Sequence, residues 1–246
     1  MANEGSKNLV RRLREAAAKE LLGLVTTHVE ALDVGALRQL FRNPHLNLPV
    51  IEVLLTQRRL LVFQEVRREL ARHPYTPEVR ALQFVAGLFW RDLLDITGEA
   101  RVRPRVRRAA ERQLLGRLLG LGTGERITIA RRASPLLVAQ LRHDSEPRVI
   151  AALLENPRLT EGALIPLASS ETAKPESLLL LARHKKWGSR YALRLTLCRN
   201  RRTPAQTAIG MLPHLKKQDL MGIERDRRLH AAVRRRAGVL LGRTPP

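Results

Sequence analysis

The sequence predicts an all-α fold, a right-handed α-solenoid of about five repeats, each of two or three helices. Three observations predict it. A short segment of basic and apolar residues recurs every 42–43 residues. A helix-breaking corner also recurs along the chain, and the apolar residues are mainly small and aliphatic. A period of this length is typical of helical repeats that stack on one another.

The repeated phrase indicates where equivalent helices lie. Its central residues are separated by 43, 42 and 42 positions, and they are Val106, Val149, Tyr191 and Val233. One further step back from Val106 leads to the stretch Glu65-Val66-Arg67-Arg68. We therefore expect a helix at each of these places.

The composition favours helices packed on helices. Apolar residues make up 44% of the 246 residues but aromatic residues only 3%, so the core is built from Leu, Ala, Val and Ile. The alternation Ile127-Thr128-Ile129 is too short to predict a strand inside a helical pattern.

The N-terminal segment is predicted to be helical. Apolar residues recur at helical spacing from Leu9 to Val25, and Ser6 is the candidate N-cap. We interpret residues 1–35 as capping helices and residues 36–246 as one continuous solenoid.

Four corner sequences separate the predicted helices. The corners are Asn43-Pro44, His73-Pro74, Asn156-Pro157 and Asn200-Arg201. A residue before proline is driven out of the helical region, so a helix ends there. A following Thr is expected to cap the next helix, and Pro is tolerated in its first turn. Arg201 stands where Pro is expected, so the pattern is degenerate.

The corners define short first helices and longer second helices. The first helices begin near Val66, Val149 and Tyr191, and two second helices are expected over residues 78–94 and 205–215. The loops 120–124 and 143–147 separate repeat units, with a helix starting at Thr123 or Gly124.

The amino-acid sequence of these corners resembles that of known repeat proteins. It is similar to HEAT/armadillo-like solenoids and, more closely, to bacterial leucine-rich-repeat-variant (LRV) proteins, in which an Asn-Pro-x-x-Thr-Pro turn precedes a Leu-rich helix. The resemblance covers residues 40–241, and residues 126–200 also resemble an uncharacterised bacterial family of such repeats. It implies an architecture and a bacterial source, and it transfers no catalytic residues.

Charge is the strongest functional indication. The chain has 45 Lys and Arg against 23 Asp and Glu, a formal net charge of +22, and 38 of its bases are Arg. Residues 177–218 contain ten bases and no acid. Arginine binds phosphate with a planar fork, so we predict a non-enzymatic, sequence-tolerant nucleic-acid-binding protein.

The predicted nucleic-acid-binding residues follow the 42–43-residue period. If stacked repeats superimpose equivalent positions, these side chains form a ladder of cations along one face. They are Arg105, Arg107, Arg108, Arg148, Lys185, Lys186, Arg190, Arg194, Arg234 and Arg235. The alternative is that these arginines form a generic charged surface.

The sequence leaves other partners open. DNA and RNA both offer phosphates, and a solenoid groove also suits an acidic protein partner. Few aromatic residues can stack bases, so backbone recognition is favoured.

A second alternative is an enzyme. HEAT-like DNA glycosylases resemble this chain in architecture and charge, and Trp90, Asp92, Asp95 and Trp187 are the residues to weigh, with Asp92 and Asp95 placed near a helix C-terminus.

The remaining chemistry is sparse. Cys198 is the only cysteine, lies in an apolar run and is expected to be a buried, inert thiol. The seven histidines lack metal-ligand spacing, and we expect no metal, cofactor or small-molecule substrate. With no signal peptide or transmembrane stretch expected, we predict a cytoplasmic protein; a basic helix resting on an anionic membrane surface is the alternative.

Overall fold

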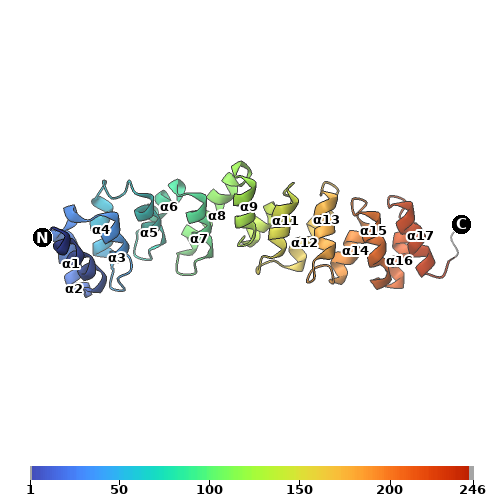
Figure 1. Ribbon diagram of the computed structural model, residues 1–246, viewed down its shortest axis with the longest axis horizontal. Coiled ribbons are helices and arrows are strands. Elements are labelled where there is room, and N and C mark those ends of the chain that lie inside the picture. The colour runs from blue at the N-terminus through green and yellow to red at the C-terminus, as the bar shows by residue number, and fades with distance from the viewer. Residues whose placement is uncertain (1, 244–246) are drawn as a thin grey trace. The chain divides into compact units, whose positions relative to one another are not determined.

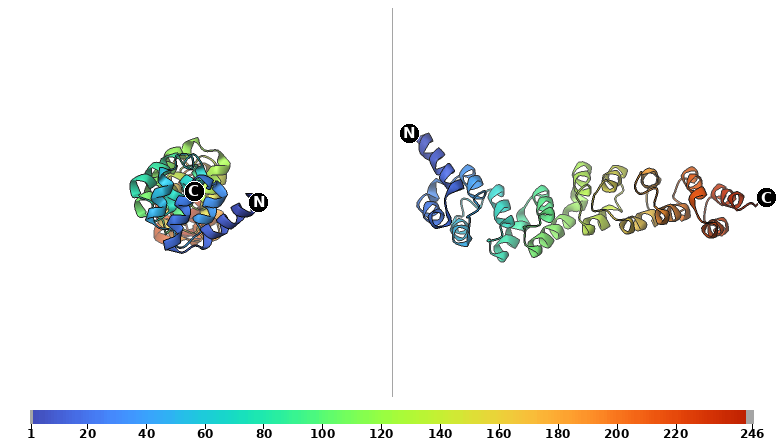
Figure 2. Two further views of the ribbon diagram at one scale, coloured as in Figure 1. Left: turned by 90° about the vertical axis from the view of Figure 1, so that its left-hand side faces the viewer. Right: turned by 90° about the horizontal axis from the view of Figure 1, so that it is seen from below.

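The computed structural model describes residues 2–243. These residues form seventeen α-helices and three short 3-10 helices, with no strand among them (Figures 1 and 2). The all-α prediction is confirmed for this part of the chain. The chain divides into two compact units, Met1–Arg117 (unit 1) and Leu118–Pro246 (unit 2).

Unit 1 contains eight α-helices and one 3-10 helix. They are α1 (Ala2–Glu15), α2 (Ala18–Thr27), η1 (Val29–Ala31), α3 (Val34–Leu40), α4 (Leu48–Thr56), α5 (Gln64–Arg72), α6 (Glu78–Gly87), α7 (Trp90–Gly98) and α8 (Pro104–Arg117). Extensive contacts join helices that are adjacent or next but one in the chain, such as α1 with α3, α2 with α4, and α6 with α8. Each helix is therefore held by its near neighbours in sequence.

Unit 2 contains nine α-helices and two 3-10 helices. They are η2 (Leu118–Gly120), α9 (Thr123–Ala130), α10 (Pro135–Leu141), α11 (Pro147–Leu154), α12 (Glu161–Ser169), α13 (Pro175–Arg183), α14 (Tyr191–Arg199), α15 (Ala205–Met211), η3 (Leu212–His214), α16 (Lys217–Arg225) and α17 (Ala231–Leu240). We call α9, α11 and α13 the odd row, and α10, α12, α14 and α16 the even row, because each helix packs on the next of its own row (Figure 1).

The core is aliphatic, as the composition predicts. In α11 the side chains of Val149, Ile150 and Leu153 are fully buried, a spacing that places them on one face of a helix. Because neighbouring helices on both sides contribute similar Leu, Val and Ala faces, the buried residues run along each unit from helix to helix.

Buried asparagines tie the corners to neighbouring helices. Asn156 is 2% exposed, and its Nδ2 donates to the carbonyl oxygens of Ala130 and Ala133, each at 2.9 Å. Its Oδ1 accepts from the backbone N–H of Arg158 at 2.8 Å. The side chain therefore fixes its own corner and also satisfies two carbonyls at the end of α9, the preceding helix of its row.

The same arrangement occurs at two other corners. Nδ2 of Asn43 donates to the carbonyls of Leu13 and Ala16, at the end of α1. Nδ2 of Asn200 donates to the carbonyls of Ala168 and Ser170, at the end of α12. In all three cases the partner helix lies two helices earlier. The prediction treated these asparagines only as residues before a turn, so their role between helices was missed.

Histidine replaces asparagine at two corners, as expected. Nδ1 of His73 accepts from the backbone N–H of Tyr75 at 3.3 Å, and burial lowers the pKa of His73. The ring is therefore neutral at pH 7 and keeps a lone pair for this bond. Nδ1 of His184 accepts from the N–H of Lys186 at 3.2 Å.

The structure corrects the predicted caps. Thr160 caps α12, with its hydroxyl accepting from the N–H of Ala163. Thr76 and Thr203 do not cap α6 and α15, because the N-cap residues are the prolines that follow them. Both threonine hydroxyls are buried and have no hydrogen-bond partner among the described residues. Ser6 lies inside α1, which begins earlier than predicted.

The structure also corrects one predicted helix. The expected helix over residues 78–94 is interrupted, because Leu88 and Phe89 are extended between α6 and α7. Asp92 consequently lies in the first turn of α7 and not near a helix C-terminus. The helix start at Thr123 is confirmed, with Glu125 Oε2 accepting from the N–H of Gly122 at 2.8 Å.

The 42–43-residue period is three helices long. Val149 lies in α11, Tyr191 in α14 and Val233 in α17, so each step passes two intervening helices. Helices of one row recur after two helices. Positions that are equivalent by the sequence period therefore alternate between the rows of unit 2.

The Asn156 interactions predict a large stability effect. We expect Asn156→Ala to lower the free energy of unfolding by about 2–4 kcal/mol, because it leaves buried carbonyls without donors and removes the corner acceptor. Urea unfolding followed by circular dichroism measures this change. Asn8→Ala, at an exposed position of α1, is the matched control and should change stability little. Equal effects of the two substitutions would contradict the role of Asn156.

Two glycines predict effects of opposite sign. A Cβ on the buried Gly188 would overlap the carbonyl oxygen of Ala182, so Gly188→Ala should destabilise the protein by about 1–3 kcal/mol. Gly210 in α15 has open space at its Cβ position, so Gly210→Ala should stabilise by about 0.5–1 kcal/mol. Thermal unfolding of both variants gives the comparison, and a stable Gly188→Ala protein would refute the close approach.

Candidate nucleic-acid interface

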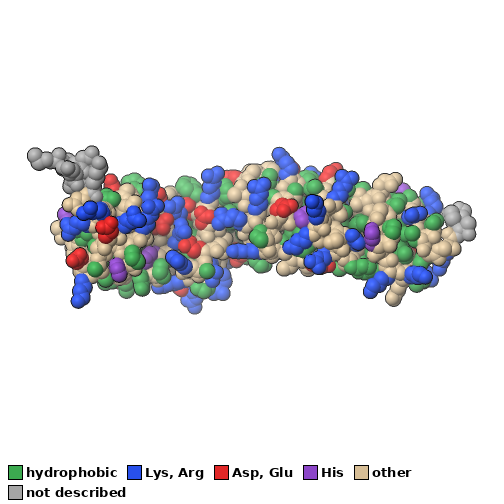
Figure 3. All heavy atoms as spheres, turned by 60° about the horizontal axis from the view of Figure 1, so that its bottom comes forward, with side chains coloured by type: hydrophobic (Ala, Val, Ile, Leu, Met, Phe, Trp, Pro, Cys, Tyr) green, Lys and Arg blue, Asp and Glu red, His purple; other side chains and the backbone are tan. Residues whose placement is uncertain are grey.

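The positive charge is unequally divided between the two units. Unit 1 has 21 Lys and Arg against 13 Asp and Glu, and unit 2 has 24 against 10. Figure 3 shows acidic side chains interspersed among the basic ones over unit 1. The excess of bases is therefore greater in unit 2.

The corners of unit 2 form two edges. One edge contains the corners that lead from an odd-numbered to an even-numbered helix, each taken with the first residue of the following helix: 131–135, 155–161, 184–191 and 212–217. We call it the basic edge, because it has eight Lys and Arg against Glu155 and Glu161.

Hydrogen bonds join the corners of the basic edge in sequence. Asn156 donates to Ala133, and Nε1 of Trp187 donates to the carbonyl oxygen of Leu154 at 3.0 Å. The hydroxyl of Tyr191 accepts from the N–H of Lys216 at 3.1 Å. Each corner is therefore fixed beside the next, and their basic side chains follow one another along the edge.

Seven bases of this edge are exposed and form no ion pair with any side chain that the structure describes. They are Arg131, Arg158, Lys185, Lys186, Arg190, Lys216 and Lys217. Nε2 of His184 lies 3.3 Å from Oε1 of Glu155. These cations are consequently available to an anionic partner.

Two of the lysines lie against aromatic rings. Nζ of Lys186 is 4.1 Å from the ring centroid of the buried Trp187, and Nζ of Lys216 is 5.4 Å from that of Tyr191. The Tyr191 hydroxyl also donates to Asp219, which raises the pKa of Tyr191. The rings are held by hydrogen bonds, so they limit the positions that the two ammonium groups take.

The opposite edge of unit 2 has a smaller excess of bases, and each of its acids forms an ion pair. We call it the paired edge; it contains the corners 142–147, 170–175, 200–205 and 226–231, with six bases and four acids. All four acids have a basic partner: Arg126–Asp144 at 3.1 Å, Arg148–Glu146 at 3.0 Å, Arg201–Glu171 at 3.3 Å and Arg228–Asp226 at 2.9 Å.

Hydrogen bonds from arginine also stabilise the charged form of two of these acids. Bonds from Arg148 hold the pKa of Glu146 below its usual value, and bonds from Arg228 do the same for Asp226. The acids of the paired edge therefore remain ionised and keep their arginines occupied.

The predicted binding residues of unit 2 fall into different surroundings. Lys185, Lys186 and Arg190 lie on the basic edge. Arg148 lies in the first turn of α11, next to the paired edge, and is bound by Glu146 of that edge. Nε of Arg194 donates to the carbonyl oxygen of Gly188 at 2.7 Å, which makes this arginine part of the corner itself.

The other predicted residues lie on helices α17 and α8. Arg235 is exposed, whereas Arg234 is half-buried with its Nε unpartnered. In unit 1, Arg105 pairs with Glu78 at 3.0 Å, Arg107 is half-buried and Arg108 is exposed. Within unit 2 the predicted residues thus lie on α11, α14 and α17 and in the corner before α14. These three helices share no extensive contact with one another.

Sequence reasoning missed Arg131 and Arg158, and it counted Lys216 and Lys217 only as members of an acid-free block. The positions of these four bases in the sequence could have identified them. Each lies in, or directly after, a corner that follows an odd-numbered helix. This pattern becomes visible only when the corners are assigned to edges.

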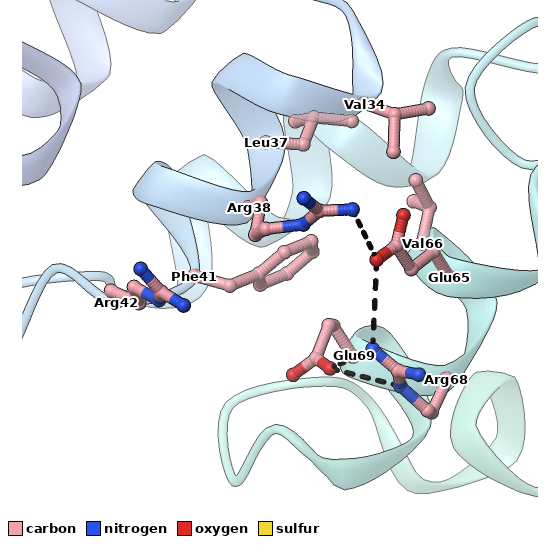
Figure 4. Close-up of a pocket in the computed structure, with 9 residues that line it drawn as sticks. All are labelled: Val34, Leu37, Arg38, Phe41, Arg42, Glu65, Val66, Arg68 and Glu69. Atoms are coloured by element: carbon pink, nitrogen blue, oxygen red, sulfur yellow. Dashed lines mark hydrogen bonds and ion pairs between the residues drawn. The ribbon is translucent and has the colours of Figure 1, made fainter. Parts of the chain in front are cut away.

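Unit 1 carries a network of ion pairs where bases and acids meet. Between α3 and α5 lies a cavity of about 410 Å³ with Phe41 and Val66 in its wall (Figure 4). Glu65 accepts from Arg38 at 2.7 Å and lies 3.9 Å from Arg68, which also pairs with Glu69 at 3.0 Å. Two of the three arginines at this cavity, Arg38 and Arg68, are therefore engaged by carboxylates.

The same network includes the carboxylate weighed as a catalytic group. Oδ1 of Asp92 lies 3.6 Å from Nη1 of Arg68, and its side chain is 16% exposed. Asp95 contributes to the charge environment of Arg72. Trp187 is buried at a corner in unit 2, where it donates its hydrogen bond to backbone. Asp92 thus has a structural partner on the neighbouring helix α5.

Comparisons of this chain with models of known protein families, with curated protein sequences and with solved structures find no match. None of the described helices has the length and apolar character needed to cross a bilayer.

The buried cysteine gives a chemical test of this part of unit 2. Cys198 is 1% exposed, and burial raises the pKa of its thiol to about 12. Because the thiolate is the reactive form, the native protein at pH 8 should react with a disulfide reagent far more slowly than the protein in urea. Absorbance of the released thiolate measures both rates, and equal rates would contradict the burial.

Proposed function

We propose that this chain is a non-enzymatic, sequence-tolerant nucleic-acid-binding protein that contacts phosphates through the basic edge of unit 2. One observation carries the proposal. Seven exposed bases of this edge have no ion-pair partner among the described residues, against three exposed bases of the paired edge, Lys174, Arg202 and Arg227. The excess charge is therefore concentrated where no carboxylate has to be displaced.

The spacing of these bases suits an extended polyanion. Packed helices lie roughly 8–10 Å apart, so corners of one edge recur at about that distance. A compact anion meets one corner at a time, whereas a nucleic-acid backbone offers phosphates along its whole length. Contacts to the backbone carry no base code, which is why we propose tolerance of sequence.

The proposal also includes the handedness of the solenoid and the number and type of its repeats. We propose a right-handed solenoid of about five HEAT- or LRV-like repeats, continuous over residues 36–246 and capped by residues 1–35. The support is that helices contact near neighbours in the chain and that the asparagine corners recur. DNA and RNA both satisfy the proposal.

A protein partner is the second candidate function. In unit 1 the side chains of Val62, Phe63 and Phe89 are 67%, 46% and 62% exposed. Their corners are neighbours, because Nε2 of Gln64 donates to the carbonyl oxygen of Gly87 at 3.1 Å. Exposed apolar groups that gather in this way favour an interaction scaffold.

A charge-matched pair of variants tests the nucleic-acid proposal. The first changes Lys185, Lys186, Lys216 and Lys217 to Gln. The control changes Arg201, Arg202, Arg227 and Arg228 of the paired edge to Gln. Both lower the net charge by four. Fluorescence anisotropy with duplex DNA and structured RNA across a salt series measures affinity and its salt dependence.

We expect a log–log salt slope of about −6 for seven phosphate contacts in the native protein. The lysine variant should reduce the magnitude of this slope by roughly 3 to 4, and the control should reduce it much less. Equal losses in the two variants would contradict the basic edge. Binding to an acidic protein that persists at high salt and requires Phe63 and Phe89 would support the scaffold instead.

A further inference from the structure

Unit 2 contains a cavity on the paired edge, away from the bases of the basic edge. It has a volume of about 240 Å³ and lies between the corners 142–147 and 170–175 and the first turn of α13. Its wall includes two cations, Arg142 and Lys174, and the hydroxyl groups of Ser170, Thr172 and Ser177.

The cations at the cavity are only partly engaged. Lys174 is exposed and makes no ion pair with a described residue, although its charge helps to lower the pKa of Glu146. Nε of Arg142 donates to Nε2 of His143 at 3.2 Å, and Arg142 forms no ion pair with a described carboxylate. The one acid in the wall, Asp144, is held by Arg126 at 3.1 Å and by the N–H of Glu146 at 2.9 Å. The cavity therefore keeps a net positive charge.

Ser177 provides an independent indication of a ligand. This residue is 2% exposed, and its Oγ is buried with no hydrogen-bond partner among the described residues. An unpaired buried hydroxyl lowers stability, so native proteins nearly always satisfy such a group. The hydroxyls of Ser170 and Thr172, also in the wall, lie 3.1 Å from each other.

The first turn of α13 adds favourable electrostatics. The N-cap residue is Lys174, which has no oxygen to cap the helix, and Pro175 follows at the first position. The N–H of Glu176 and the positive end of the helix dipole thus have no side-chain cap. Anions bind well at such helix starts when cations and hydroxyls surround them.

We propose that this cavity binds a phosphate group, either inorganic phosphate or the phosphate of a small monoester. In the bound state Ser177 donates its hydroxyl to a phosphate oxygen, Arg142 and Lys174 balance the charge, and Ser170 and Thr172 supply further hydrogen bonds. The sequence predicted no small ligand. The site is independent of nucleic-acid binding, because its residues do not belong to the basic edge.

Binding to the full chain tests the proposal. Isothermal titration calorimetry and ³¹P NMR are carried out with inorganic phosphate and, separately, with a nucleoside 5′-monophosphate, at constant ionic strength. Arg142→Gln and Lys174→Gln should each weaken binding at least tenfold. Lys19→Gln, an exposed lysine of unit 1, is the matched control and should bind as the native chain does.

Ser177→Ala separates binding from folding. The substitution removes a hydroxyl that has no partner, so the melting temperature without phosphate should be unchanged or higher, while the affinity for phosphate should fall at least tenfold. Binding of inorganic phosphate, of the monoester or of both, with these losses, supports the site and identifies its source. Absence of saturable binding of either ligand, or variants that bind as tightly as the native chain, would overturn it.

Discussion

The hydrogen bonds of the buried corner asparagines are the constraint on which the rest of the structure depends. The helices of this chain contain only 7–14 residues, too few to be stable alone, and their aliphatic faces specify position poorly. The corner asparagines fix the position of one helix on another. The side-chain amides of Asn43, Asn156 and Asn200 each donate to two backbone carbonyls at the end of the helix two places earlier in the chain. The aliphatic side chains thus supply the buried apolar surface, and the asparagines fix the relative positions of the helices.

Arginine has two separate uses in this chain. Some guanidinium groups act as asparagine does, by donating to carbonyls at the ends of earlier helices. Arg59 donates to Leu32 at 3.1 Å, Arg103 to Pro74 at 2.6 Å and Arg117 to Leu88 at 2.6 Å. These arginines are held by the fold. Seven exposed bases of the basic edge, by contrast, form no ion pair with a described side chain.

The two edges of unit 2 differ for a simple reason. Successive corners alternate between the edges, so acids placed in every second corner accumulate on one side. Asp144, Glu171 and Asp226 all lie in such corners and are paired there, with Arg126, Arg201 and Arg228. The opposite corners receive Lys and Arg. Unit 2 therefore has one edge whose acids are all paired and whose excess of bases is two, and one edge whose excess of bases is six.

The sequence by itself determined the helices, most corners and the total charge, because helical spacing, proline and capping residues act over a few positions. It also identified Cys198 as buried and Lys185, Lys186 and Arg190 as candidate contacts. Only the tertiary structure decided which bases are free, since their partners lie far along the chain: Arg105 pairs with Glu78 over 27 positions and Arg201 with Glu171 over 30. The alternation between rows likewise depends on packing between helices that are next but one in the chain, which the local residue pattern does not specify.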